Sequence, residues 1–164
     1  MPEARAERER FLAAKKATPE DAAFGNNRAS DLLEIAARVL DGEMLAQEGK
    51  LAEAASILEE AVVREAKLRY DEPPDWIQPV RHTLGAVLLR AGRAAEAEKV
   101  YRADLAVWPD NGWSLTGLRD SLRAQGRAKE AREADARLGK AWADADIRPS
   151  VSCYCQAGRI AAHQ

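Results

Sequence analysis

The sequence is poor in the residue types that carry most catalytic and metal chemistry. Its 164 positions include two cysteines, two histidines and 5% aromatic residues. Cys153 and Cys155 are too close together to build a disulfide framework. With His82 and His163 as the only histidines, the chain has no Ser/His/Asp order and no His–Glu metal motif, and it also lacks a glycine-rich phosphate loop. We therefore expect no enzymatic activity and no cofactor.

An excess of positive charge and long apolar runs are also missing. Charged residues make up 32% of the chain, but the formal net charge is only −2, because both signs alternate along the sequence. A basic stripe that would neutralise phosphates is absent, which disfavours nucleic acid as a partner. No apolar run approaches the about 20 residues needed to cross a bilayer, and the charged residues 1–10 lack the apolar segment of a secretory signal. We expect a cytoplasmic protein without a membrane partner.

What the sequence does contain is alanine-rich helical periodicity interrupted by glycine. Apolar residues recur at helical spacing, and Gly49, Gly92 and Gly126 mark tight turns between helices. Asp31 with Glu34 three residues later has the pattern of a capping box. Helices are expected at residues 3–17, 30–48, 51–69, 77–91, 94–107, 112–125 and 128–145.

Two stretches of the chain match each other at a spacing of 34 residues. Leu84, Leu88, Gly92 and Ala97 are followed 34 positions later by Leu118, Leu122, Gly126 and Ala131. The preceding glycine interval, from 49 to 92, is 43 residues, and its extra nine residues fall in a longer helix end and a double-proline loop. A period of this length is typical of helix–turn–helix solenoids, whose units stack because none can bury its apolar face alone.

The middle repeat resembles the tetratricopeptide repeat. Leu84-Gly85, Gly92, Ala97, Tyr101 and Pro109 stand where that family has its Leu-Gly pair, turn glycine, small residue, aromatic and closing proline. Gly85 and Ala97 would allow close helix approach, while Tyr101 would fill the space between repeats. The flanking repeats depart from the pattern in three slots, which suggests that the last unit is a capping repeat. The departures are at Asp41, Arg119 and Asp135.

The resemblance implies an all-α, right-handed α-solenoid of antiparallel helix pairs with about three repeats. The expected domains are a charged helix and loop at residues 1–29, the repeats at 30–147, and an irregular, extended or disordered tail at 148–164. The chain is also similar, over residues 5 to 147, to the C-terminal region of large bacterial tetratricopeptide proteins of unestablished activity. The segments that carry this similarity are 24–27, 70–76, 79–81 and 111–115. It implies that the chain is a C-terminal fragment or a short version of such a protein.

Tetratricopeptide arrays bind peptides or partner helices on a concave groove lined by the first helix of each pair. Arg90 and Arg123, with Trp113, would clamp a carboxylate or pack an aromatic side chain of a partner. The alternative is that these are ordinary solvated residues on alanine-rich helices. The groove residues implied by this geometry are Glu43, Ala46, Gln47, His82, Ala86, Leu89, Arg90, Trp113, Thr116, Asp120 and Arg123.

The double-proline loop at residues 70–76 is the most unusual local feature. Tyr70, Asp75 and Trp76, with Arg81, would form a binding lip beside the groove. We favour the alternative, in which Trp76 fills the gap left by the longer connection and Arg81 pairs with Asp71 or Asp75. Three asparagines are expected in turns or as helix caps. These are Asn26, Asn27 and Asn111.

The Cys-x-Cys pair in the tail supports three interpretations. The two thiolates would bind one soft metal ion, with His163 or His82 completing the site, although the spacings of a closed zinc site are absent. They would otherwise form a redox pair, or be reactive thiols without a function.

The sequence thus predicts a non-catalytic scaffold that binds a protein or peptide partner. One alternative is a structural module that caps a longer array or self-associates, with burial of Phe11 or Trp142 between copies. The second alternative is a metal-handling protein that acts through Cys153 and Cys155.

Overall fold

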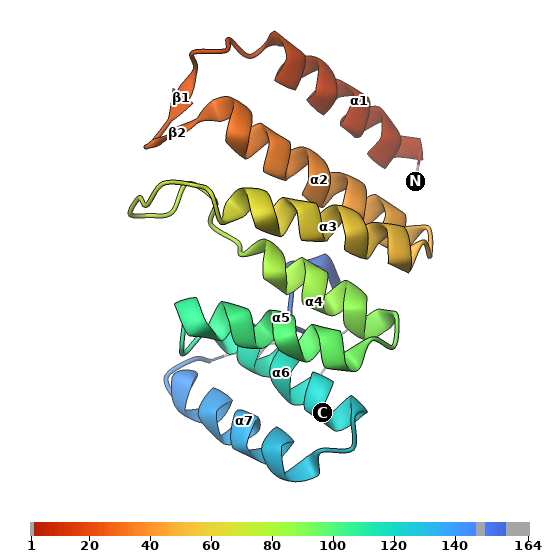
Figure 1. Ribbon diagram of the computed structural model, residues 1–164, viewed down its shortest axis with the longest axis vertical. Coiled ribbons are helices and arrows are strands. Elements are labelled where there is room, and N and C mark those ends of the chain that lie inside the picture. The colour runs from red at the N-terminus through yellow and green to blue at the C-terminus, as the bar shows by residue number, and fades with distance from the viewer. Residues whose placement is uncertain (1, 147–149, 157–164) are drawn as a thin grey trace. The chain divides into compact units, whose positions relative to one another are not determined.

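The computed structural model describes residues 2–146 and 150–156, and within them the protein is predominantly helical (Figure 1). Among these residues, no helix is long and apolar enough to cross a membrane. Two two-residue strands and a short 3₁₀ helix, η1 (Tyr154–Gln156), are the other regular elements. The α-helices are α1 (Pro2–Ala17), α2 (Ala29–Gln47), α3 (Leu51–Glu65), α4 (Val80–Arg90), α5 (Ala94–Val107), α6 (Gly112–Ala124) and α7 (Ala128–Ala141).

The chain divides into two compact units. Unit 1 ends at Val80, and unit 2 begins at Arg81. The division falls inside the range 30–147 that the sequence pattern groups as one repeat domain.

Unit 1 is built on the packing of α2 against α3. Ile35, Ala54 and Leu58 are fully buried between the helices. Gly42 has no room for a side chain, since a Cβ there would lie 2.7 Å from Cγ of Leu58. In contrast, α1 has no buried residue. It contacts α2 and the C-cap residue Glu48 through ion pairs, among them Arg5–Glu48, Arg8–Asp41 and Lys15–Glu34.

Unit 2 buries the positions that repeat at a spacing of 34 residues. Leu84 and Leu88 in α4, Leu118 and Leu122 in α6, and Ala131 in α7 are each at most 3% exposed. The apolar positions deduced from the sequence are therefore core positions, and α6 packs against both α5 and α7.

The predicted glycine turns are confirmed. Gly49, Gly92 and Gly126 have φ values of 80°, 73° and 74°, a left-handed conformation that side chains disfavour. At the first turn the amide of Gly49 donates to the carbonyl of Ala46, and the amide of Lys50 donates to that of Leu45. These bonds satisfy carbonyls that the end of a helix leaves free.

Several predicted helix boundaries were wrong. α3 ends four residues before the expected 69, and α4 begins at Val80 rather than at 77. The Glu65 carboxylate accepts a hydrogen bond from the Val80 amide at 3.2 Å, which satisfies a free N–H in the first turn of α4.

The predicted capping box at Asp31 and Glu34 was wrong as well, because α2 begins at Ala29 with Arg28 as its N-cap. Glu34 instead binds Lys15 and Arg38.

The loop expected at residues 24–27 belongs instead to an antiparallel pair of β1 (Ala23–Phe24) and β2 (Asn27–Arg28). Gly25, with φ 56°, supplies the left-handed residue of this two-residue turn. A stretch this short has no alternation that would identify a strand in the sequence.

Candidate binding surface

Tyr101 of α5 fills a slot between two glycines of unit 2. A Cβ on Gly85 of α4 would lie 2.3 Å from Cζ of the Tyr101 ring, and one on Gly117 of α6 would lie 2.1 Å from it. The ring is fully buried, and burial raises the pKa of the Tyr101 hydroxyl above its ordinary value. The sequence predicted the role of Gly85 in this packing, but it gave no signal for Gly117.

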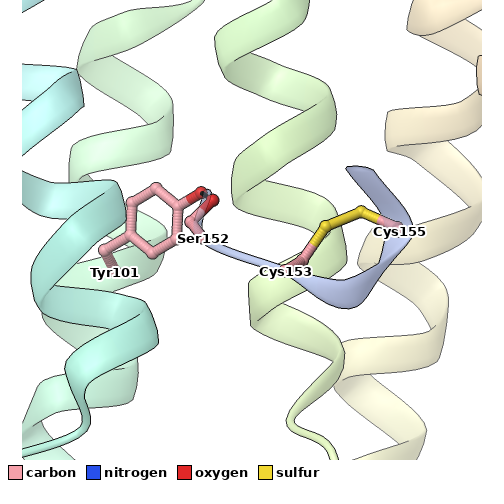
Figure 2. Close-up of a disulfide and its surroundings, with 4 residues drawn as sticks. All are labelled: Tyr101, Ser152, Cys153 and Cys155. Atoms are coloured by element: carbon pink, nitrogen blue, oxygen red, sulfur yellow. Dashed lines mark hydrogen bonds between the residues drawn. A yellow bond between two sulfur atoms is a disulfide. The ribbon is translucent and has the colours of Figure 1, made fainter. Parts of the chain in front are cut away.

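The Tyr101 hydroxyl makes its hydrogen bond with the C-terminal segment of the chain. Its oxygen lies 2.6 Å from Oγ of Ser152, and Figure 2 shows the tyrosine side chain pointing to this serine. Ser152 and Cys153 are 4% and 2% exposed. The prediction of an extended or disordered tail is therefore wrong for residues 150–156. Hydrogen bonding and burial hold this segment against unit 2.

The same segment carries an aromatic contact. The Tyr154 ring lies against Trp113 of α6 with a centroid distance of 4.5 Å, and Trp142 meets Trp113 edge-on at 5.9 Å. Tyr154 is still 61% exposed, so the contact is at the surface. A Cβ on Gly112 would clash with the Trp142 ring, which explains a glycine in the first turn of α6. Trp113, one of the predicted groove residues, is thus already in contact with an aromatic side chain of the same protein, Tyr154.

Cys153 and Cys155 form a disulfide (Figure 2). Neither sulfur is then a thiolate, the form that binds metal ions and attacks disulfides. Of the two other suggested metal ligands, His82 is buried and bonded elsewhere, while His163 lies outside the described residues. No group of three or more His, Cys, Asp or Glu residues suited to a metal ion occurs in residues 2–146 and 150–156.

A buried polar cluster lies beneath the N-terminus of α6. Asp104 accepts a hydrogen bond of 2.5 Å from the Ser114 hydroxyl, and Nε2 of His82 lies 3.3 Å from the same carboxylate oxygen. Nδ2 of Asn111 lies 3.2 Å from Nε2 of His82. Asn111 is the N-cap of α6, as expected of a turn asparagine, since its Oδ1 accepts the amides of Trp113 and Ser114.

This cluster has the residue types of a hydrolase triad but not its connectivity. A nucleophilic serine gives its proton to histidine, whereas Ser114 gives its hydrogen bond to Asp104. Ser114 is also fully buried, so no substrate reaches its hydroxyl. The geometry indicates that the cluster fixes the start of α6.

The predicted groove residues of unit 2 differ widely in exposure. His82, Ala86 and Thr116 are buried, and the Thr116 hydroxyl donates to the carbonyl of Gly112 at 2.8 Å. Their side chains are therefore not exposed to a partner as expected. The half-buried residues are Leu89, Trp113 and Asp120. The exposed ones are Arg90 and Arg123.

The two exposed arginines lie in the last turns of two helices of unit 2, Arg90 in α4 and Arg123 in α6. Arg123, in the last turn of α6, lies 3.8 Å from Asp120, and Asp120 also accepts a hydrogen bond of 2.8 Å from Arg119. The pair of Arg123 with Asp120 is long and largely in contact with solvent, so it is weak and a partner carboxylate readily replaces it. Arg123 thus remains suited to binding a carboxylate.

The first-repeat residues of the predicted groove lie on α2 in unit 1. Ala46 is buried, Glu43 is half-buried and Gln47 is exposed. Burial raises the pKa of the Glu43 carboxyl above its ordinary value.

The double-proline loop is bound to the turn between β1 and β2. Asn27 is buried, donates to the carbonyl of Arg69 at 3.1 Å and to Asp75 at 2.8 Å, and accepts the Arg69 amide at 2.8 Å. Asn26 binds Asp71 through its amide at 3.2 Å and the Tyr70 carbonyl through its side chain at 2.9 Å. These contacts are those of a structural element, which agrees with the favoured interpretation of the loop.

The loop carboxylates bind the asparagines next to the turn. Asp71 accepts the Asn26 amide, and Asp75 accepts the Asn27 side chain. Arg81, at the start of α4, is half-buried. Tyr70 is exposed, with its hydroxyl on Glu72. Trp76 is half-buried, and its Nε1 has no hydrogen-bond partner among the described residues.

An open hollow of about 620 Å³ lies beside this loop in unit 1. Residues of the 20–28 segment line it, together with Asp31, Lys67 and Arg69. Its walls carry charges of both signs, so it has no preference for an anion or a cation, and it includes none of the predicted groove residues.

No protein-family model matches the chain, and no curated protein matches it. The case for its function therefore comes from its own residues.

Proposed function

We propose that the chain is a tetratricopeptide-like scaffold that binds a protein or peptide partner without chemical catalysis. In this proposal α2–α3, α4–α5 and α6–α7 are antiparallel pairs of a right-handed solenoid. Its support is the burial of the residues that repeat every 34 positions and the left-handed glycine at each turn. The Tyr101 ring between Gly85 and Gly117 also suits the close helix packing of such a repeat.

The observation that carries the proposal is the contact of residues 150–156 with helices α5 and α6 of unit 2. A short, irregular segment already places a hydroxyl on Tyr101 and an aromatic ring on Trp113. A surface that accepts these groups from its own chain has the shape and chemistry to accept them from a partner. Aromatic anchors such as Trp113 contribute a large share of the energy at protein interfaces.

The chemistry of the surface favours an acidic partner segment with an aromatic side chain. Trp113 supplies the stacking contact, and the exposed Arg123 supplies a cation at the other end of α6. Arginine binds a carboxylate through paired N–H donors. We also propose a bacterial, cytoplasmic setting, on the basis of the resemblance and of the small number of cysteines.

Affinity capture from a bacterial lysate, followed by mass spectrometry, tests this proposal. The bait is the full chain, compared with Arg90→Ala/Trp113→Ala/Arg123→Ala. A matched control, Lys129→Ala/Arg132→Ala, removes two exposed cations from α7. We expect a partner that the wild type and the control retain and the triple variant loses, with unchanged helicity. Equal capture by all three baits, or none, would refute binding at this surface.

Self-association is the second outcome that the same samples report. Trp142 packs on Trp113 and Gly112 within the chain, which leaves less of its ring for a second copy than the sequence-based alternative requires. Sedimentation of the wild type at increasing concentration separates the two functions. A monomer favours the partner-binding scaffold, and a dimer lost in Trp142→Ala favours the structural module.

A further inference from the structure

The 150–156 segment contacts helices α5 and α6 of unit 2 through two residues, with one residue between them. Ser152 bonds to Tyr101, and Tyr154 stacks on Trp113. Cys153, the residue between them, is buried. The segment therefore has the spacing of a bound peptide, with a small hydroxyl residue and an aromatic residue two positions later.

The disulfide lies within this contact. It links Cys153 to Cys155, so it closes a ring around Tyr154 with Ser152 immediately before it. The ring restricts the backbone between the two contacting residues. A disulfide that limits the free chain in this way favours the bound conformation. Reduction restores the conformational freedom of these residues. The reduced segment then loses this conformational entropy each time it binds.

We propose that residues 150–156 are an internal ligand of the Trp113 surface, and that the Cys153–Cys155 disulfide is a redox switch that controls their release. Oxidised, the segment covers Trp113; reduced, it detaches and leaves Trp113 to an external peptide. The inference rests on the proposed function in one respect, since the released surface must have a partner. In a cytoplasmic location disulfides are transient, which suits a switch better than a permanent crosslink.

The redox step needs a dithiol reductant. A thiolate of the dithiol attacks the sulfur of Cys155, which is half-buried, while Cys153 is buried and leaves as the thiolate. The second thiol of the reductant then displaces Cys155. Two electrons and two protons pass to the protein, which gains two thiols, and the reductant becomes a disulfide.

Nuclear magnetic resonance of the tryptophan indole N–H groups tests the proposal on the full chain. The four indole signals are assigned with single Trp→Phe variants. The Trp113 signal is then compared in the oxidised chain, in the chain reduced with dithiothreitol, and in oxidised Tyr154→Ala. Trp76 is the reference signal, because it belongs to unit 1 and the proposed contact involves residues of unit 2 alone.

We expect the Trp113 signal of the reduced chain to move toward its position in Tyr154→Ala, while the Trp76 signal stays in place. Opening a ring this short is expected to lower the ratio of bound to released segment by about tenfold. Cys153→Ser/Cys155→Ser should give the reduced spectrum with or without dithiothreitol. An unchanged Trp113 signal on reduction would overturn the switch, and an unchanged signal in Tyr154→Ala would overturn the internal ligand.

The failure of this inference is distinguishable from the failure of the proposed function. The indole signals report the segment without any partner, whereas lysate capture reports the partner. If reduction moves the Trp113 signal but neither redox state captures a partner, the switch stands and the scaffold function fails. Capture that is equal in both redox states, with an unmoved signal, overturns the switch alone.

Discussion

Replacing Gly117 by alanine is expected to destabilise unit 2, because the added methyl group would overlap with the Tyr101 ring. The added Cβ would lie 2.1 Å from Cζ and 2.3 Å from Cε1 of that ring. Tyr101 is fully buried, and on its other side Gly85 is equally close, so the ring has no free space to move into. Overpacking of this kind costs about 1–3 kcal/mol, against which the better helix propensity of alanine returns about 0.5–1 kcal/mol.

Gly139 in α7 is the matched control. A Cβ there meets nothing within 4 Å, so Gly139→Ala is expected to stabilise unit 2 by about 0.5–1 kcal/mol. The assay is thermal unfolding of the full chain, followed by circular dichroism and tryptophan fluorescence. In a unit of this size, 1 kcal/mol shifts Tm by about 4–8 °C. The two substitutions should therefore move Tm in opposite directions.

A double-mutant cycle identifies the cause. In Tyr101→Leu the ring is absent, so Gly117→Ala should cost less in this background than in the wild type. If Gly117→Ala raises Tm as much as Gly139→Ala does, the ring does not occupy the slot, and the packing argument for unit 2 is refuted.

Three further predictions concern single side chains. Asn111→Ala removes the N-cap of α6 and should cost about 1 kcal/mol in chemical denaturation, whereas Asn111→Asp should retain most of it; an equal loss in both would contradict the capping role. Asn27→Ala removes three hydrogen bonds and should cost about 2–3 kcal/mol, with faster hydrogen exchange at the Arg69 amide; unchanged exchange would argue against these bonds. Hydrogen bonds from Lys15 and Arg38, opposed by partial burial, lower the pKa of Glu34 below its ordinary value. The ionised Glu34 therefore stabilises the fold at pH values above its unfolded-state pKa, and this stabilisation is lost as the pH falls through the lower folded-state pKa. Thermal unfolding below about pH 4 should show this loss in the wild type, and a Glu34→Gln variant with the same acid slope would count against it.

The sequence was informative where structure depends on neighbours along the chain. Gly49, Gly92 and Gly126 mark turns because each adopts a backbone conformation that other residues disfavour. Leu84 and Leu118 repeat because each occupies the same buried position of a helix. These features are local and periodic, so they can be identified without knowing what packs against them.

The features that the sequence did not predict depend on residues far apart in the chain. Tyr101 bonds to Ser152, 51 positions later, and nothing in the tail sequence shows periodicity. Gly117 was overlooked since its role exists only relative to the Tyr101 ring. The capping box failed because Lys15, on another helix, binds Glu34 and α2 begins earlier. In the last case a tertiary contact overrode a local sequence pattern.

The Asn27 contacts have a consequence for the order in which unit 1 folds. Its side chain satisfies both the amide and the carbonyl of Arg69, 42 positions away, much as a neighbouring strand would. The chain between these residues is the whole of α2 and α3. Closing so long a loop costs entropy, and that cost falls once the two helices have packed and brought its ends together. We therefore expect the helices to associate first and the Asn27 bonds to form late, so that native-state exchange would release the double-proline loop before α2 and α3 separate.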